Sequence, residues 1–92
     1  GGTILPGLAI SLDALAKRTA KLPQIDITTP PPQVIGRNTI DAMKSGVLNG
    51  YGSMVDGLIE KISGELCPNG EPFKVLATGG MAHLIAPFSK CI

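Results

Sequence analysis

The feature that most constrains the fold is residues 38–65, where an apolar helical repeat is combined with five glycines. Apolar side chains recur there at the three- and four-residue spacing of an amphipathic helix: Ile40, Met43, Val47, Tyr51, Met54, Val55, Leu58 and Ile62. Each glycine weakens an isolated helix by about 1 kcal/mol. Asn38 is a good N-cap, and Asp41 follows it three residues later, as in a capping box. The pattern predicts one long helix over 39–65 that packs against something else.

The small residues of this helix fall on one side. At about 100° per residue, a narrow stripe contains Gly46, Gly50, Ser53, Gly57 and Gly64. A stripe of small side chains lets a second backbone approach closely. We interpret it as a helix–helix seam that could join two copies of the chain. The alternative is a helix that breaks at residues 50–52.

The low content of charged residues indicates that the chain has an apolar face that another part of the protein or a partner covers. Hydrophobic residues make up 43% of the chain and charged residues only 16%, against roughly 25% charged in an ordinary globular protein. Too few charges are present to cover the surface of a small domain. The chain starts at Gly1 and shows no end signal at Ile92. We therefore expect residues 1–92 to be a single partial domain of a longer protein, with a processed small protein as the alternative.

The composition argues against several classes of partner. The net charge is +1 with scattered Lys and Arg, and one Tyr and two Phe offer no stacking platform, so no nucleic-acid partner is predicted. No apolar run approaches the roughly 18 residues of a membrane span. Cys67 and Cys91 lack metal-ligand spacing. Two thiols in the reducing cytoplasm are the favoured interpretation, and one disulfide is the alternative.

The remaining segments predict an α/β fold that is rich in helix. A first helix is expected over 8–20, ended by Leu22-Pro23, and a third over 81–86, ended by Pro87. Strands are expected over 2–5 and 74–78. Residues 24–28 read as a short extended segment, 29–32 as a stiff proline loop, and 67–72 as a surface turn.

The predicted strand over 74–78, the pair Gly79-Gly80 and the predicted helix over 81–86 follow one another directly. This arrangement is the one candidate ligand-binding site in the sequence. Glycines after a strand let a ligand approach the backbone closely. The start of the following helix offers unpaired N–H groups that suit a phosphate or the ribose and base of a nucleotide. Most Gly-Gly pairs are only turns, so the spacing alone is weak evidence for a nucleotide site.

Five blocks in the same order resemble the type III pantothenate kinases. These blocks are residues 1–8 (GGTILPGL), 19–23 (TAKLP), 35–46 (IGRNTIDAMKSG), 50–51 with 55–58 (GY and VDGL), and 75–82 (VLATGGMA). They are similar to that family's turn "GG-x-I-x-PG-L", its "TAKLP", its "IG-K-NT-x-x-AM-x-SG", the continuation of its helix, and its "VIATGGLA". The resemblance covers essentially the whole chain.

The resemblance implies a fold and a reaction. The family belongs to the acetate and sugar kinase, Hsp70 and actin superfamily, with two ribonuclease H-like halves. This chain would be part of the C-terminal half, with an incomplete sheet. Family members transfer the γ-phosphoryl group of ATP, bound with a divalent cation, to pantothenate in the first step of coenzyme A synthesis. They are homodimers, need potassium or ammonium, and bind pantothenate near the dimer interface.

The resemblance assigns few residues. Thr39 matches the position that contacts pantothenate, and Gly79 and Gly80 match the pair that packs near the adenosine of ATP. From its position alone, Thr39 could equally help to cap a helix. His83 has no role in the pattern and is expected at a surface or interface.

No residue of the chain matches the catalytic base or a metal ligand of the family. The segments that would supply them ("D-x-G-N-T", "G-x-D-R" and "D-x-G-T-A") do not occur in the chain, and none of its aspartates matches the base: Asp13, Asp26, Asp41 and Asp56. Residues 1–92 alone are therefore expected to be catalytically inert. The alternatives are a non-catalytic dimerising scaffold and a transcription accessory factor of the same family.

Overall fold

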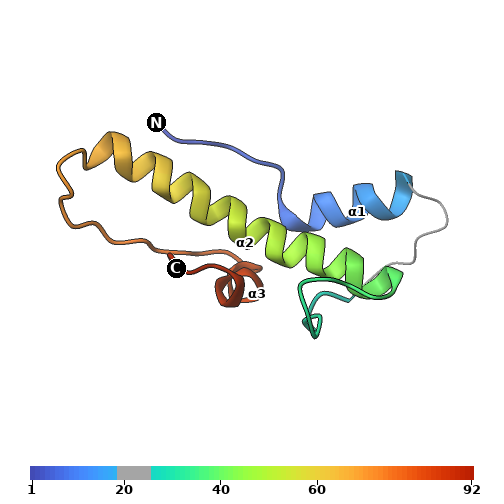
Figure 1. Cartoon of the computed structure of the whole chain (residues 1–92). Coiled ribbons are helices and arrows are strands. Elements are labelled where there is room, and N and C mark those ends of the chain that lie inside the picture. The colour runs from blue at the N-terminus through green and yellow to red at the C-terminus, as the bar shows by residue number, and fades with distance from the viewer. Residues whose placement is uncertain (19–25) are drawn as a thin grey trace. The chain divides into compact units, whose positions relative to one another are not determined.

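The computed structural model describes residues 1–18 and 26–92. They form two compact units, residues 1–47 and 48–92. Figure 1 shows the elements in chain order: the helices α1 (Leu8–Arg18), α2 (Thr39–Leu66) and α3 (Ala82–Ile85), and a 3-10 turn η1 (Ala86–Phe88). Helix α2 contributes its first part to one unit and its remainder to the other.

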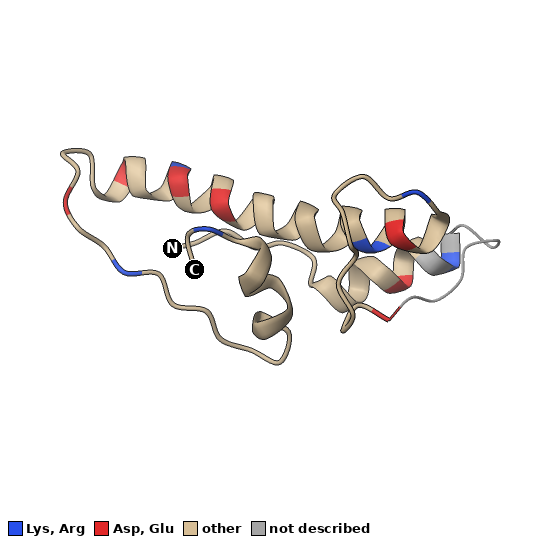
Figure 2. Cartoon of the chain, turned by 60° about the horizontal axis from the view of Figure 1, so that its bottom comes forward, with Lys and Arg blue, Asp and Glu red and all other residues tan. Residues whose placement is uncertain are grey.

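Helix α2 confirms the prediction of one long helix, and the alternative of a break at residues 50–52 is wrong. Its backbone is helical without interruption from Thr39 to Leu66. The cap is also confirmed: the Asn38 side-chain oxygen accepts a hydrogen bond from the Asp41 N–H (2.9 Å), and the Asn38 amide donates to the Asp41 carboxylate (3.0 Å). Residues 45–55 carry no charge, which leaves the middle of α2 uncoloured in Figure 2.

The first unit contains α1. The helix begins after Gly7, whose carbonyl accepts a hydrogen bond from the Ser11 N–H at 3.0 Å. Leu8 is buried, while Leu12 and Leu15 are half-buried, so these three leucines at helical spacing mark the covered side of the helix. The predicted end at residue 20, and the stop at Leu22-Pro23, lie outside the described residues.

The expectation of an extended segment over 24–28 is wrong for its described part. Asp26 accepts hydrogen bonds from the Thr28 N–H (2.9 Å) and the Thr28 hydroxyl (2.5 Å), which curls the backbone into a turn. These bonds lower the pKa of Asp26, with the hydroxyl as the main cause. Short polar side chains compete with ladder formation in this way. Residues 24 and 25 lie outside the described part.

The second unit ends in two short helical turns. The surface turn after α2 is confirmed: Gly70 has φ 76°, and its N–H donates to the Cys67 carbonyl at 3.1 Å. The predicted helix over 81–86 is shorter, Ala82–Ile85, and η1 follows it directly. Pro87 does not end the helix but lies inside η1, because the first turn of a helix does not use its N–H groups.

The strands expected over 2–5 and 74–78 are wrong for the structure described. Both segments are irregular, and the described residues include no strand. A strand forms only where a neighbouring segment exchanges backbone hydrogen bonds with it, and the described residues supply no such neighbour. Ile4 is 98% exposed and Leu76 86% exposed. The α/β expectation is thus met only as a helix-rich arrangement without a sheet.

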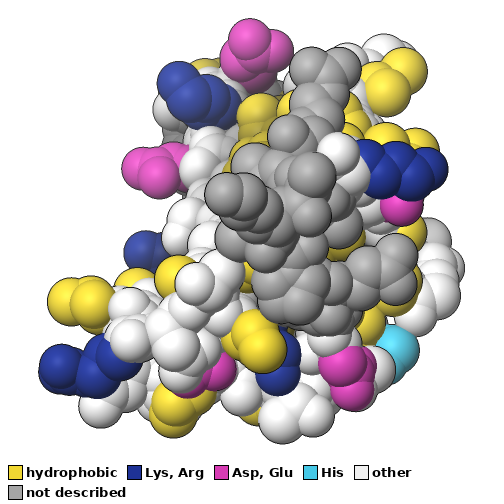
Figure 3. All heavy atoms as spheres, turned by 90° about the vertical axis from the view of Figure 1, so that its right-hand side faces the viewer, with side chains coloured by type: hydrophobic (Ala, Val, Ile, Leu, Met, Phe, Trp, Pro, Cys, Tyr) yellow, Lys and Arg dark blue, Asp and Glu magenta, His cyan; other side chains and the backbone are white. Residues whose placement is uncertain are grey.

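Apolar side chains are only partly covered, as the low charge content predicted. The buried hydrophobic residues are Leu8, Ile27, Met43, Val47, Leu48 and Ile85. Many others stand at the surface, where Figure 3 shows hydrophobic side chains among charged ones. In the part of the chain that the structure describes, no helix has the length and hydropathy to cross a bilayer.

The cap of α2 gives a first prediction. Asn38→Ala removes the acceptor for the Asp41 N–H and should lower the free energy of unfolding by about 1 kcal/mol. Asn38→Ser restores a side-chain oxygen and should recover most of the loss. Urea unfolding followed by circular dichroism measures both variants, and equal stability of Asn38→Ala and the unaltered protein would contradict the cap.

Candidate functional site

The predicted substrate side of the molecule is the start of α2 and the loop that precedes it. Gly36 lies so close to the first turn of the helix that a Cβ there would overlap the backbone of Asp41 and Ala42. One turn further along, the buried Ser45 hydroxyl donates a hydrogen bond to the Val34 carbonyl. A backbone contact and a side-chain bond thus hold the loop against α2 and fix the surroundings of Thr39.

Thr39 is the first residue of α2 and is exposed. It borders an open cavity of about 410 Å³, whose other lining residues are Leu15, Ala42, Met43, Gly46 and Val47. The cap of α2 is made by Asn38. The interpretation of Thr39 as the capping residue is therefore not needed, and Thr39 is one of the residues that line a mostly apolar hollow.

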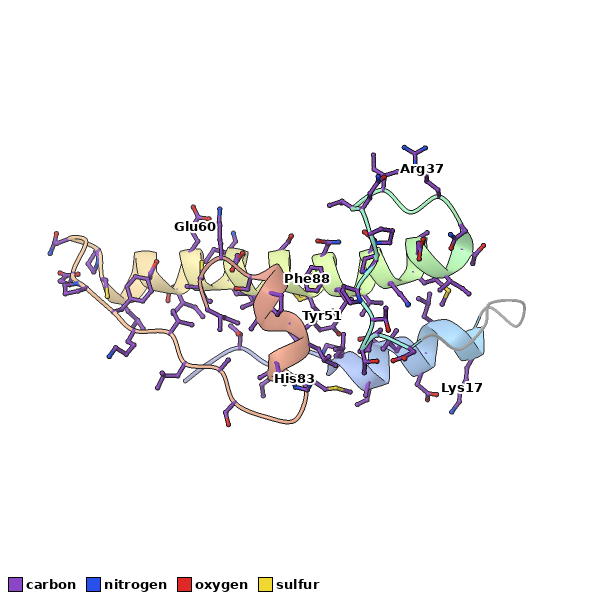
Figure 4. The ribbon with its side chains drawn as sticks, turned by 90° about the horizontal axis from the view of Figure 1, so that it is seen from below. Lys17, Arg37, Tyr51, Glu60, His83 and Phe88 are labelled. Carbon is purple, nitrogen blue, oxygen red and sulfur yellow. The ribbon has the colours of Figure 1, made fainter. Side chains whose placement is uncertain are left out.

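A second, smaller cavity of about 120 Å³ lies on the loop side of the same helix start. Its lining residues are Pro32, Gln33, Ile35, Gly36, Arg37 and Asp41. Arg37 is exposed and points away from the helix in Figure 4. The Asp41 carboxylate accepts a hydrogen bond from the Asn38 amide at 3.0 Å. This cavity therefore presents both the positive charge of Arg37 and the negative charge of Asp41.

Gly79 and Gly80 lie together in the second unit, in an exposed turn that leads into α3. Gly79 has φ 110°, a conformation that side chains other than glycine rarely adopt. The Gly79 carbonyl accepts a weak hydrogen bond from the Ala82 N–H at 3.3 Å. A Cβ at either glycine would have no atom within 4 Å, so the backbone of this turn is open to a flat ligand. Thr39 belongs to the other compact unit.

One carboxylate in the second unit, that of Asp56, accepts several hydrogen bonds that no pattern in the sequence predicted. Asp56, half-buried in α2, accepts hydrogen bonds from the Ser89 hydroxyl (2.5 Å), the Lys90 N–H (3.0 Å) and the Cys91 N–H (3.1 Å). One turn before it, Gly52 is buried, and a Cβ there would overlap the Phe88 carbonyl. Figure 4 shows Phe88 beside α2. We call this arrangement the clasp: Gly52 and Asp56 on α2, holding residues 88–91.

The clasp changes the acidity of two groups. The hydrogen bond from the Ser89 hydroxyl, followed by that from the Lys90 N–H, lowers the pKa of Asp56 to about 2. Desolvation raises the pKa of the Cys91 thiol, and the neighbouring Asp56 raises it further. Asp56 therefore stays an anion and Cys91 a protonated thiol at neutral pH. Neither group is poised to accept or release a proton during catalysis.

The other aspartates also have local partners. Asp13 pairs with Lys17 at 3.0 Å on α1, and Asp26 accepts from Thr28. His83 is exposed on α3, as expected of a surface residue (Figure 4). Both cysteines are free. Among the residues described, no group of three or more His, Cys, Asp and Glu could hold a metal ion.

Sequence reasoning missed three residues that shape these surfaces: Gly36, Gly52 and Asp56. The two glycines looked like others in the chain, because only the structure shows which of them touch another backbone. Asp56 gave a usable signal, as a lone acid between Val55 and Gly57 in a helix whose preceding turns are uncharged. A charge in such a place needs a partner, which a search among the hydroxyl-bearing residues could have suggested.

The acidity of Asp56 gives a second prediction. Its pKa is lowered from 3.8 to about 2 in the folded chain. Its stabilising contribution is therefore complete above the ordinary pKa and is lost as the pH falls through about 2. The carboxyl ¹³C shift of Asp56, followed by NMR, should titrate with that low midpoint. Ser89→Ala removes the main cause and should raise the midpoint, whereas a midpoint near 3.8 in the unaltered protein would contradict the clasp.

Comparison with known proteins places these surfaces in a family. The family profile for type III pantothenate kinase matches residues 1–61, a range that contains Thr39. A relative from Desulfotalea psychrophila, named type III pantothenate kinase, is 58% identical over 92 residues, which cover all of this chain and 35% of the relative. Relatives of the same name from Desulforapulum autotrophicum and Pelobacter propionicus are each 49% identical over the whole chain, which covers 34% and 35% of them.

The chain thus spans about a third of the length of the curated relatives that it matches. The aligned range extends through residue 92, so it also covers Gly79, Gly80 and residues 88–91 of the clasp, which lie beyond the profile match. The family profile covers most of the chain, and the relatives cover all of it. The chain therefore belongs to the type III pantothenate kinase family.

Proposed function

We propose that the chain is part of an enzyme that transfers the γ-phosphoryl group of ATP to pantothenate. The product is 4′-phosphopantothenate, and the step is the first in coenzyme A synthesis. The observation that carries this proposal is the 58% identity, over the whole chain, to a relative that bears the kinase name. The domain is part of the C-terminal ribonuclease H-like half of that enzyme. The free thiols of Cys67 and Cys91 suit a reducing compartment, and we place the reaction in the cytoplasm.

Thr39 is our proposed contact to pantothenate. Its hydroxyl is exposed at the start of α2, beside the 410 Å³ cavity, while Asn38 meets the need for a cap. Unpaired N–H groups of a first helical turn favour a polar or anionic ligand. In phosphoryl transfer most of the catalytic effect comes from positioning and charge stabilisation. The role of Thr39 is therefore to orient pantothenate.

Gly79 and Gly80 are our proposed contact to ATP. The exposed turn with φ 110° at Gly79 presents bare backbone, against which the flat adenosine can pack. Among the described residues, no group of three or more His, Cys, Asp and Glu could hold the divalent cation that accompanies ATP, and the proposed reaction also needs potassium or ammonium. We assign those ions, and the catalytic base, to other segments of the enzyme. The chain alone is expected to be inert.

The role of Thr39 is tested by kinetics of the enzyme of full length. Loss of one hydrogen bond costs about 0.5–1.5 kcal/mol, so Thr39→Ala should raise the KM for pantothenate by a factor of about two to ten and leave the KM for ATP unchanged. Thr39→Ser keeps the hydroxyl and should behave like the unaltered enzyme. If Thr39→Ser is as impaired as Thr39→Ala, the hydroxyl is not the contact; if neither variant differs, Thr39 has no role.

The glycine stripe of α2 is our proposed homodimer seam. In the described chain, a Cβ at Gly46, Gly50, Gly57 or Gly64 would have no atom within 4 Å, so the stripe has room for a second backbone. Such close packing leaves no space for a large side chain.

Sedimentation at several concentrations tests the seam. Gly50→Leu should shift the enzyme of full length from dimer toward monomer. Glu65→Leu places the same side chain on an exposed position about 60° around the helix from Gly50 and about 100° from Gly46 and Gly64, and it should leave the dimer intact. A dimer that tolerates Gly50→Leu, or an unaltered enzyme that is monomeric throughout, would exclude the seam.

A further inference from the structure

The clasp joins two features of α2 that act on the same short segment. Gly52 and Asp56 are one helical turn apart. The first lets the Phe88 carbonyl lie directly on the helix, and the second accepts three hydrogen bonds from the residues that follow. Steric contact fixes where residue 88 lies, and the carboxylate fixes the direction of residues 89–91. Together they determine both the position and the orientation of this segment.

The clasped segment is continuous with the Gly79-Gly80 turn. Consecutive hydrogen bonds link the backbone from one to the other: Ala82 N–H to the Gly79 carbonyl, Leu84 N–H to the Met81 carbonyl, and Ser89 N–H to the Ala86 carbonyl. Helix α3 and η1 lie between them, with Ile85 as the buried anchor. Residues 79–81 themselves are exposed. The turn is therefore positioned from its C-terminal side, through Ile85 and the clasp.

We propose that Gly52 and Asp56 are positioning residues for the nucleotide, because they hold the Gly79-Gly80 turn in the conformation that receives ATP. The inference rests on the proposed function, and it assigns the two residues a task that no sequence pattern gave them. Asp56 does not touch the ligand in this account. Both of its oxygens are already occupied, Oδ1 by Ser89 and Cys91 and Oδ2 by Lys90.

A simple population argument gives the size of the effect. A ligand binds only the fraction of molecules in which its site is formed, and its apparent dissociation constant rises as that fraction falls. With the clasp intact, the segment that follows the Gly79-Gly80 turn is held in place both at Ile85 and at residues 88–91. If loss of the clasp leaves only about a tenth of the molecules with a formed turn, the affinity for ATP falls about tenfold.

The experiment compares two pairs of variants in the enzyme of full length. Asp56→Asn replaces Oδ2, the acceptor for the Lys90 N–H, with a donor, and Glu60→Gln makes the same change at an exposed site one turn further along α2. Gly52→Ala pushes a methyl group into the Phe88 carbonyl, and Gly7→Ala adds the same group outside the proposed dimer seam, where no atom lies within 4 Å. Ser89→Ala removes a single donor and serves as the mild variant if Asp56→Asn fails to fold.

Steady-state kinetics should separate positioning from general damage. In Asp56→Asn and Gly52→Ala we expect the KM for ATP to rise about tenfold while kcat and the KM for pantothenate stay unchanged. The controls Glu60→Gln and Gly7→Ala should match the unaltered enzyme. Hydrogen exchange at residues 79–91 should accelerate in the clasp variants alone. Equal losses for both substrates, or an unchanged KM for ATP despite faster exchange, would overturn the proposal.

Direct binding of ATP distinguishes this inference from the proposed function. If the unaltered enzyme binds ATP by calorimetry but does not phosphorylate pantothenate, the proposed reaction is wrong. Weaker binding of ATP by Asp56→Asn would then still support the clasp. If the unaltered enzyme binds no ATP, the clasp positions no nucleotide and the inference fails. If Asp56→Asn does not fold, Ser89→Ala decides by the same binding measurement.

Discussion

Both units depend on backbone that lies directly against α2 at a glycine. At Gly36 the loop before the helix meets its first turn, and at Gly52 the C-terminal segment meets its middle. Neither contact has room for a Cβ. A short polar side chain locks each one: Ser45 bonds to the Val34 carbonyl, and Asp56 receives Ser89 and two backbone N–H groups. Close approach followed by a hydrogen bond is thus the means by which irregular segments are fixed on this helix.

The sequence predicted the helices well, because their signals are local. The apolar repeat and the Asn38 cap located α2 to within one residue, and Leu8, Leu12 and Leu15 located the start of α1. The strands at 2–5 and 74–78 could not be predicted reliably, because a strand is defined by its neighbour and not by its own residues. The turn at Asp26 was not predicted for the opposite reason, because it depends on one local interaction. The Asp26 carboxylate accepts a hydrogen bond from the Thr28 N–H, although the surrounding residues alternate as in a strand.

The residues of the candidate site also divide into those that the sequence predicted and those that only the structure revealed. Thr39, Gly79 and Gly80 came from the family resemblance, and the structure places each of them on an exposed surface with room for a ligand. Gly52 and Asp56 were missed because they contact Phe88 and Ser89, which are far away in the sequence. Gly36 was missed because its contact with the first turn of α2 depends on the path of the loop. Asp41 accepts a local hydrogen bond from the Asn38 amide, and Asp56 accepts long-range hydrogen bonds from residues 89–91. We propose that the chain supplies surfaces that orient two substrates and that the reacting groups come from elsewhere in the enzyme.

The central claim is that the start of α2 receives pantothenate and the Gly79-Gly80 turn receives ATP. Hydrogen exchange of the enzyme of full length, measured with each ligand separately, tests it most directly. We expect pantothenate to slow exchange around residues 36–42 and ATP with its divalent cation to slow it at residues 79–84. Protection of neither segment by a ligand that demonstrably binds, or protection of each by the other ligand, would contradict the account.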